Sequence, residues 1–218
     1  MLKKLLLALV LFVGGFAAFV ATRPATFRVE RSATIKAPVE VVYAQVNDFH
    51  AWAAWSPWEK LDPAMKRTYS GEVSGVGAAY AWVGIDEVGE GTMAIIAARP
   101  SDEIVIRLEF LKPWKAVNTT TFSFKQSGDA TTVTWAIDGE NDFMGKAMSV
   151  FMNMDRRVGG YFERGLAAMS TVAEAAATLK AEEAAKAAAA AKIAADAAVD
   201  AHPPKVPPPV DPAAPATK

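Results

Sequence analysis

Alternation of hydrophobic and polar positions along much of the chain predicts an antiparallel sheet. From Phe27 to Ile35, apolar and polar side chains alternate with a period of two, which is typical of a strand with one buried face. The same alternation, interrupted by turn residues, predicts later strands at Tyr69–Val73, Gly77–Val83, Gly91–Ala98, Glu103–Leu111, Asn118–Lys125 and Thr131–Ile137. Short strands joined by tight turns favour an antiparallel sheet with one face on the core.

Three other stretches of the chain are predicted to be helical, two of them from apolar residues at helical spacing. Pro38 suits the first turn of a helix, and valines recur at helical spacing as far as Asn47. A short helical or irregular piece follows from His50 to Trp58. From Met144 to Val172, apolar side chains recur at steps of three and four in an unbroken stripe, which predicts one long helix lying across the sheet. A strand, helices, strands and a long helix in this order indicate an α+β fold.

The N-terminal segment, residues 1–26, has the pattern of a membrane helix. Lys3 and Lys4 precede an uncharged run from Leu5 to Thr22, which as a helix would span roughly 27 Å. A cleaved signal peptide starts in the same way, but the one passable cleavage site, Gly15–Ala17, lies inside the apolar run. We therefore expect a retained single-pass anchor in a bacterial inner membrane, with the following domain on the periplasmic side.

Two regions of different composition follow this segment. Residues 27–180 hold the mixture of aromatic, β-branched and charged side chains that a packed core needs, whereas residues 181–218 are dominated by alanine and then by proline. Because alanine has the highest helix propensity, we expect a helical spacer, followed from His202 by an extended, disordered proline-rich tail. Such a tail can bind a partner protein, but a plain spacer is the simpler interpretation.

Composition excludes several kinds of chemistry. The chain has no cysteine, which rules out disulfides and thiolate catalysis, and its two histidines, His50 and His202, are too few for a histidine-rich metal site. With 23 basic and 24 acidic side chains, the net charge of −1 argues against nucleic-acid binding. The glycines between residues 71 and 91 punctuate strands and open no helix, so they form no phosphate-binding loop. We expect no metal and no cofactor.

Several motifs, taken in order, resemble those of one protein family. They are Trp52–Trp58, the glycine-rich segment Tyr69–Trp82, Val88–Met93, Thr132–Trp135 and Phe162–Leu166. Their order and spacing are similar to those of the SRPBCC (START-like) superfamily, in its polyketide cyclase/dehydrase-like branch, where an N-terminal membrane helix is common. The resemblance implies a helix-grip fold, in which a curved antiparallel sheet surrounds a long C-terminal helix and an apolar cavity lies between them.

Large side chains on the predicted inward faces are candidates for lining such a cavity, because rings with one polar group suit an apolar pocket. With two positions on the long helix added, the candidate ligand-binding residues are Trp52, Trp55, Tyr80, Trp82, Phe110, Trp135, Phe151 and Asp155. Plainer interpretations exist. The tryptophans can simply fill a core, and Asp155, four residues after Phe151, can pair with an arginine of the sheet or of a neighbouring turn.

These features favour a membrane-anchored domain that binds a small hydrophobic ligand, such as a lipid, a quinone, an isoprenoid or an aromatic metabolite. An enzyme of the cyclase or aromatase type is the alternative. It needs an acid–base set for which only Asp155, His50 and tyrosines are candidates, so we assign no catalytic residue. A structural or partner-binding envelope protein is a third interpretation, and the alanine- and proline-rich tail is its best argument.

Overall fold

The computed structural model describes residues 1–200 of the chain, with side chains described to residue 197. The chain divides into two compact units, Met1–Ala177 and Thr178–Lys218. The predicted sheet and the apolar N-terminal segment both belong to the first unit. The proline-rich tail expected from His202 lies outside the described residues.

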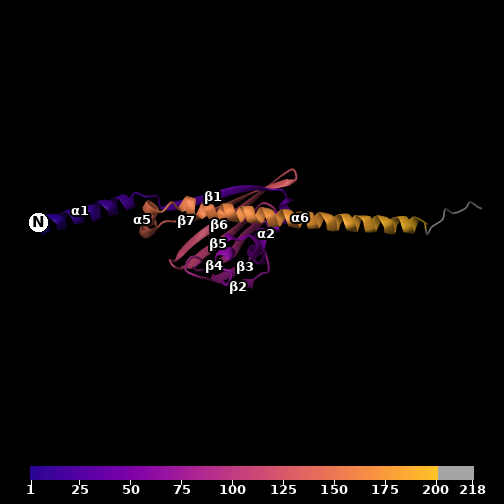
Figure 1. Ribbon diagram of the computed structural model, residues 1–218, viewed down its shortest axis with the longest axis horizontal. Coiled ribbons are helices and arrows are strands. Elements are labelled where there is room, and N and C mark those ends of the chain that lie inside the picture. Colours follow the sequence, from indigo (N-terminus) through magenta and orange to yellow (C-terminus); the bar gives the residue numbers. More distant parts are fainter. Residues whose placement is uncertain (201–218) are drawn as a thin grey trace, which may run out of the picture. The chain divides into compact units, whose positions relative to one another are not determined.

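Seven antiparallel strands form a single curved sheet in the first unit (Figure 1). In chain order they are β1 (Thr26–Ile35), β2 (Lys66–Gly71), β3 (Ala78–Val83), β4 (Glu90–Arg99), β5 (Glu103–Lys112), β6 (Ala116–Ser127) and β7 (Ala130–Glu140). Their order across the sheet is β1-β7-β6-β5-β4-β3-β2, so every strand after β1 lies beside its neighbour in sequence. β1 pairs with β7 and thereby joins the two ends of the domain.

Helices occupy the remaining sequence. They are α1 (Leu2–Ala21), α2 (Val39–Asn47), the 3-10 turn η1 (Phe49–Ala51), α3 (Trp52–Trp55), α4 (Pro57–Leu61), α5 (Phe143–Phe151) and α6 (Met154–Asp200). The buried face of α6 packs on the sheet through Phe162, Leu166, Met169 and Ala173. The α+β order and the helix-grip arrangement of a curved sheet around a long C-terminal helix are confirmed.

The long helix expected from Met144 to Val172 is divided into two helices, α5 and α6. Met152 has extended backbone angles (φ −120°, ψ 124°), which end α5. The Asn153 side-chain oxygen then accepts a hydrogen bond from the Arg156 N–H at 2.9 Å, capping the start of α6. Hydrophobic spacing misses this break because apolar side chains continue on both sides of a cap that consists of one polar residue.

Two polar attachments join α6 to the edge strand β1 and to the residue that follows it, Lys36. Arg31 donates hydrogen bonds to Asp155 (2.9 Å) and Glu163 (2.7 Å), so its guanidinium bridges two positions two helical turns apart. A Cβ at Gly159, between them, would overlap that guanidinium, which explains the glycine. Farther along, the Lys36 backbone N–H donates to the Glu174 carboxylate at 3.3 Å. The first part of α6 is therefore held both by its apolar face and along its side.

Two glycines of α6 make a matched pair for testing how closely the helix packs. An alanine Cβ at Gly165 would lie 2.8 Å from the Trp135 ring and 3.1 Å from Pro57, whereas at Gly160 it would meet only Arg164, at 3.7 Å. Gly160→Ala should stabilise the domain by about 0.5–1 kcal/mol through helix propensity. Gly165→Ala should destabilise it by about 1–3 kcal/mol because a tightly packed interface must move apart. Urea unfolding followed by circular dichroism measures both, and equal effects would contradict the close approach of α6 to β7.

One helix among the described residues is long and apolar enough to cross a bilayer. It is α1, whose side chains are almost all exposed, Val20 being the buried exception. A membrane anchor and a signal peptide both fit this description.

Candidate functional site

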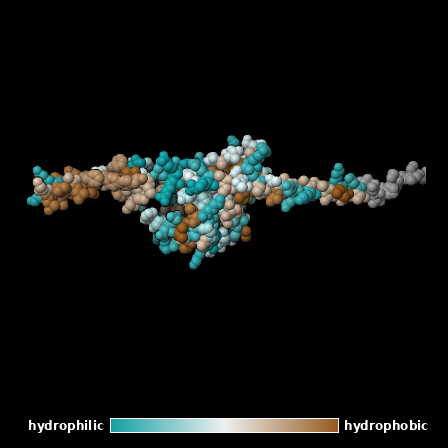
Figure 2. Space-filling model, in the orientation of Figure 1, coloured by the Kyte–Doolittle hydropathy of each residue, from teal (hydrophilic) through white to brown (hydrophobic). Residues whose placement is uncertain are grey.

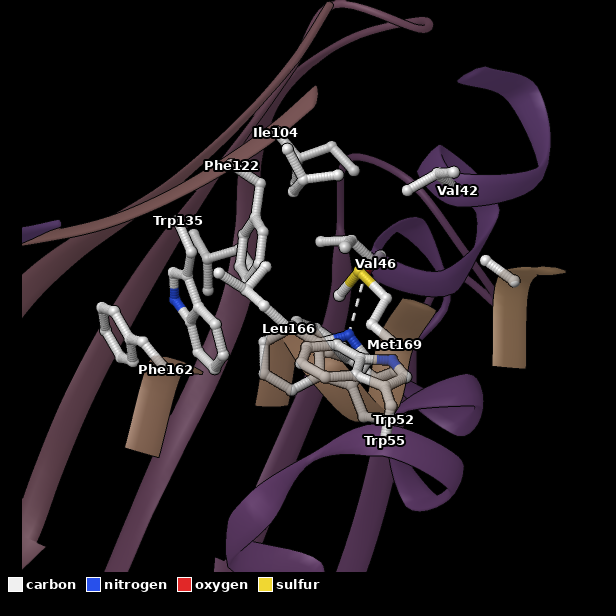
Figure 3. Close-up of a cluster of buried hydrophobic side chains, with 14 of the residues drawn as sticks. Val42, Val46, Trp52, Trp55, Ile104, Phe122, Trp135, Phe162, Leu166 and Met169 are labelled. Carbon is white, nitrogen blue, oxygen red and sulfur yellow. Dashed lines mark hydrogen bonds between the residues drawn. The ribbon is translucent and has the colours of Figure 1, made fainter. Parts of the chain in front are cut away.

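Aromatic rings fill one part of the space between the sheet and α6 (Figure 3). Trp135 of β7 stacks on Phe162 of α6 with ring centroids 4.0 Å apart, and on Phe122 of β6 at 4.8 Å. Trp52 and Trp55 of α3 pack against the same rings. Their indole N–H groups donate to the carbonyl oxygens of α2 residues 46 and 45, at 3.1 and 2.9 Å, so α3 is fixed to α2 as well as to the sheet. This cluster, which we call the aromatic plug, consists of Trp52, Trp55, Phe122, Trp135 and Phe162.

Burial on the inner face of the sheet changes along the strands. On β5, Ile104 and Ile106 are fully buried, whereas Leu108 and Phe110, on the same face, are only partly buried. β1 and β4 show the same trend from Val29 to Phe27 and from Ile95 to Met93. We call the partly buried set the open end of the inner face; its members are Phe27, Met93, Leu108 and Phe110.

Polar side chains are present on the inner face near the open end. Asn118 and Thr120 occupy buried inward positions of β6, four and two residues before Phe122, respectively. Asn118 and Phe27 both lie over Gly139, where any side chain would overlap them. An apolar surface with a few polar groups is the usual composition of a site for a small hydrophobic molecule.

The indole N–H of Trp135 is the one polar group of the aromatic plug that is buried without a hydrogen-bond partner among the described residues. An unsatisfied buried donor costs about 1–3 kcal/mol. Figure 3 shows its nitrogen on the side of the ring away from Trp52 and Trp55. An acceptor atom on a bound molecule would satisfy this group, and nothing else in the plug needs one because the other two indoles are already bonded.

A buried polar network stands beside the plug. The Tyr80 hydroxyl donates to one Glu59 carboxylate oxygen at 2.9 Å, and the Arg67 guanidinium donates to the other at 2.6 Å. Burial, followed by the charge of Glu59, raises the pKa of Tyr80 well above its usual value. Both carboxylate oxygens are occupied and the phenol is a weak acid, so the network is suited to joining α4 to β2 and β3.

Six of the eight candidate residues lie on the inner side of the sheet. Trp52, Trp55 and Trp135 belong to the aromatic plug, while Tyr80, Trp82 and Phe110 form a neighbouring row with ring centroids 6.0 and 5.9 Å apart. Trp82 also donates its N–H to the Val88 carbonyl at 3.2 Å. Their role in binding a ligand stays a prediction.

The other two candidates lie elsewhere. Phe151, at the end of α5, is 76% exposed and its ring is 6.1 Å from that of Phe16 in α1. Asp155, with its side chain 61% exposed, forms the ion pair with Arg31, which was the plainer interpretation of this residue. Arg31 lowers the pKa of Asp155 below its usual value through that hydrogen-bonded pair.

Sequence reasoning missed Phe27, Met93, Leu108, Asn118 and the Glu59–Arg67 pair. The first four lie within strands that the sequence predicts, and they could have been added as candidates by following the inward alternation along each whole strand. Arg67 lies just before the strand that was predicted to start at Tyr69. Glu59 lies in a helix of five residues, which is too short for the spacing of its apolar residues to show which way it faces. His50 stacks on Tyr69 at 4.0 Å and contacts Asp48 at 2.8 Å, on the surface.

Beyond the aromatic plug, the other kinds of site to consider among the described residues are metal-binding groups and surface grooves. Among residues 1–197, no group of three or more histidine, aspartate or glutamate side chains could hold a metal ion. One open groove lies where the start of β1, the end of β7 and the start of β6 meet, and its lining includes Phe27 and Asn118. A second, of about 640 Å³, lies between α4 and α6 and is lined in part by Leu61, Tyr161 and Arg164.

Comparison with known proteins adds a family and several similar structures. A family model described as polyketide cyclase/dehydrase and lipid transport matches residues 26–174. Protein CV1439 from Chromobacterium violaceum is 16% identical, with a TM-score of 0.49 over 69% of this chain and 99% of that one. Mll3558 from Rhizobium loti is 19% identical, with a TM-score of 0.47 over 66% and 96%. No curated protein matches the sequence.

Proposed function

Because the chain belongs to the polyketide cyclase/dehydrase and lipid transport family, an SRPBCC-type family, we propose that its domain binds one small hydrophobic molecule between the sheet and the helices. The proposed ligands are a lipid, a quinone, an isoprenoid or an aromatic metabolite. The proposed domain covers residues 27–180, between an N-terminal anchor (residues 1–26) and a C-terminal spacer and tail (residues 181–218).

The unpartnered N–H of Trp135 is the observation that carries this proposal. Natural cores pair nearly all of their buried donors, so an unpaired one beside partly buried apolar residues points to a bound acceptor. A carbonyl or hydroxyl group on an otherwise apolar molecule would supply it. In this proposal the ligand tail lies along Leu108 and Phe110, and its polar group reaches Trp135.

Membrane anchoring through α1 is the second part of the proposal. The helix carries no acidic residue and exposes apolar side chains along its length, and the two lysines at its start favour a cytoplasmic N-terminus. The domain would then lie on the periplasmic side of the inner membrane, where an apolar ligand is available from the bilayer.

A binding function is preferred to a cyclase or aromatase. Acid–base catalysis requires a proton donor or acceptor that is free to reach the substrate. The buried carboxylate of Glu59 has both oxygens in hydrogen bonds, and Asp155 is paired with Arg31.

Extraction of the protein from native membranes tests both parts of the proposal. We expect it to remain in the membrane pellet after a carbonate wash and to release an apolar molecule into organic solvent after purification in detergent. The released molecule is identified by mass spectrometry and compared with a mock purification. A soluble protein shortened at its N-terminus would contradict the anchor, and an extract equal to the mock would contradict the binding function.

A further inference from the structure

Exposed apolar side chains gather on α5 beside α1. Phe143, Met144, Phe151 and Met154 expose large parts of their side chains, and none of the nine residues of α5 is fully buried. Figure 2 shows the hydrophobic surface of α1 continuing onto this region of the first unit. A surface helix of a soluble domain normally turns such residues inward. This apolar face therefore needs a partner.

The position of α5 relative to α1 indicates which partner it is. The Asn141 backbone N–H donates to the Ala25 carbonyl at 2.7 Å, so the start of α5 is joined to the segment that leaves α1. At the other end of α5, Phe151 contacts Phe16. Phe16 lies six residues before Thr22, the end of the apolar run, which is about 9 Å along a helix. That depth matches the layer of about 5–10 Å into which interfacial helices insert.

Charges around α5 suit a surface of anionic lipid. No acidic residue occurs between Phe143 and Met154. The flanking acids are engaged, since Asp142 caps α5 through the Gly145 N–H and Asp155 pairs with Arg31. Three basic residues, Lys146, Arg156 and Arg157, lie within or just after this segment. None of the three forms an ion pair with any of the described side chains, residues 1–197. Cations near a membrane surface are attracted by anionic headgroups.

The turn between β5 and β6, at the same end of the sheet, also exposes an apolar side chain next to a basic one. The turn between β5 and β6 carries Trp114, which is 68% exposed, next to Lys115. β6 begins opposite the end of β7, and the end of β7 pairs with Thr26 at the start of β1, so this turn and the exit of α1 share one end of the sheet. Tryptophan and lysine together are typical of the interface between lipid and water.

We propose that α5 and the β5–β6 turn form a second membrane contact, which lays this end of the sheet on the bilayer. The inference rests on the proposed anchor α1 and adds an orientation to it. The open end of the inner face, with Phe27, Leu108 and Phe110, belongs to the same end of the strands. An apolar ligand then passes between the lipid and the inner face without crossing water. A second copy of the chain would cover α5 equally well, but it would not account for the continuity with α1 or for the three unpaired cations.

Single-cysteine labelling tests this orientation, since the chain has no cysteine of its own. The full-length variants Met144→Cys, Trp114→Cys, Val73→Cys and Leu9→Cys are labelled with an environment-sensitive fluorophore. They are reconstituted in vesicles of equal parts phosphatidylcholine and phosphatidylglycerol. Val73 is the matched control because it is 73% exposed in the β2–β3 connection, at the other end of β3 from the proposed contact. Leu9 reports on α1 itself.

Labels at residues 144 and 114 should be quenched by brominated lipid and protected from aqueous iodide, with an iodide quenching constant several-fold below that at residue 73. Iodide quenching at 144 and 114 equal to that at 73, with residue 9 protected, would overturn the inference and leave the anchor intact. Protection at 144 without quenching by brominated lipid would assign the face to a second copy and also overturn it. Iodide access at residue 9 would contradict the anchor as well.

Discussion

Replacing Trp55 by alanine is expected to lower the free energy of unfolding by about 3–5 kcal/mol, the range for truncating a buried aromatic side chain. Trp55 is fully buried, its ring centroid lies 4.7 Å from that of Trp52 and 5.6 Å from that of Trp135, and its N–H is bonded to the Gln45 carbonyl. The change therefore removes packing and leaves a backbone acceptor without its partner. Denaturant unfolding of the detergent-solubilised full-length protein, followed by circular dichroism, measures the loss.

Trp114→Ala is the matched control for this change. It removes the same side chain from an exposed turn and should alter the free energy of unfolding in detergent by no more than about 0.5 kcal/mol. If both variants lost the same small amount, the aromatic plug would not be the centre of the core.

Phe110→Ala is expected to weaken binding of the extracted ligand by about 1–3 kcal/mol, the value of burying one large apolar side chain. Phe110 is only partly buried in the protein alone, so its ring is available to a ligand and its loss costs less stability than a change in the plug. Ile96→Ala, on β4, removes an exposed apolar side chain of similar size and should leave affinity unchanged. Titration calorimetry of both variants, each first shown to be folded, gives the difference.

An affinity for the Phe110→Ala variant equal to that of the unchanged protein would place the ligand away from the open end. The groove between α4 and α6 would then be the next surface to test.

Most strands were predictable because apolar and polar side chains alternate along them. β1 and β5 show this most clearly, since one inward row of side chains is buried or partly buried along each whole strand. A period of two needs no knowledge of the partner strand, so the sheet and the α+β class follow from local sequence. Tight turns also favour the side-by-side arrangement of β2 to β7, whereas the pairing of β1 with β7 joins distant segments and does not follow from local sequence.

The misplacement of Asp155 has a specific physical cause. An unbroken helix would have put it one turn after Phe151, on the same face. The break at Met152 and Asn153 means that the direction of a side chain in α6 no longer follows from its spacing to residues of α5. Asp155 lies in the first turn of α6, where it pairs with Arg31. The spacing of the apolar residues does not indicate this helix cap.

The missed parts of the candidate site depend on contacts between distant segments. The unpartnered N–H of Trp135 is visible only when every neighbour of the indole is known. The partial burial of Leu108 and Phe110, compared with Ile104 and Ile106, depends on which distant segments pack over each part of β5. All four positions hold large apolar residues at a spacing of two, so the sequence could identify them as inward-facing and no more.

Nuclear magnetic resonance of the ¹⁵N-labelled indole groups tests the central claim most directly. The Trp135 signal, identified by its loss in Trp135→Phe, is followed while the extracted ligand is added to the full-length protein in detergent. The account predicts a large downfield shift of the Trp135 N–H proton as it gains an acceptor. The Trp52 and Trp55 signals should move much less, because their N–H groups are already bonded to backbone carbonyls. A ligand that binds while the Trp135 signal stays in place would contradict the proposed site.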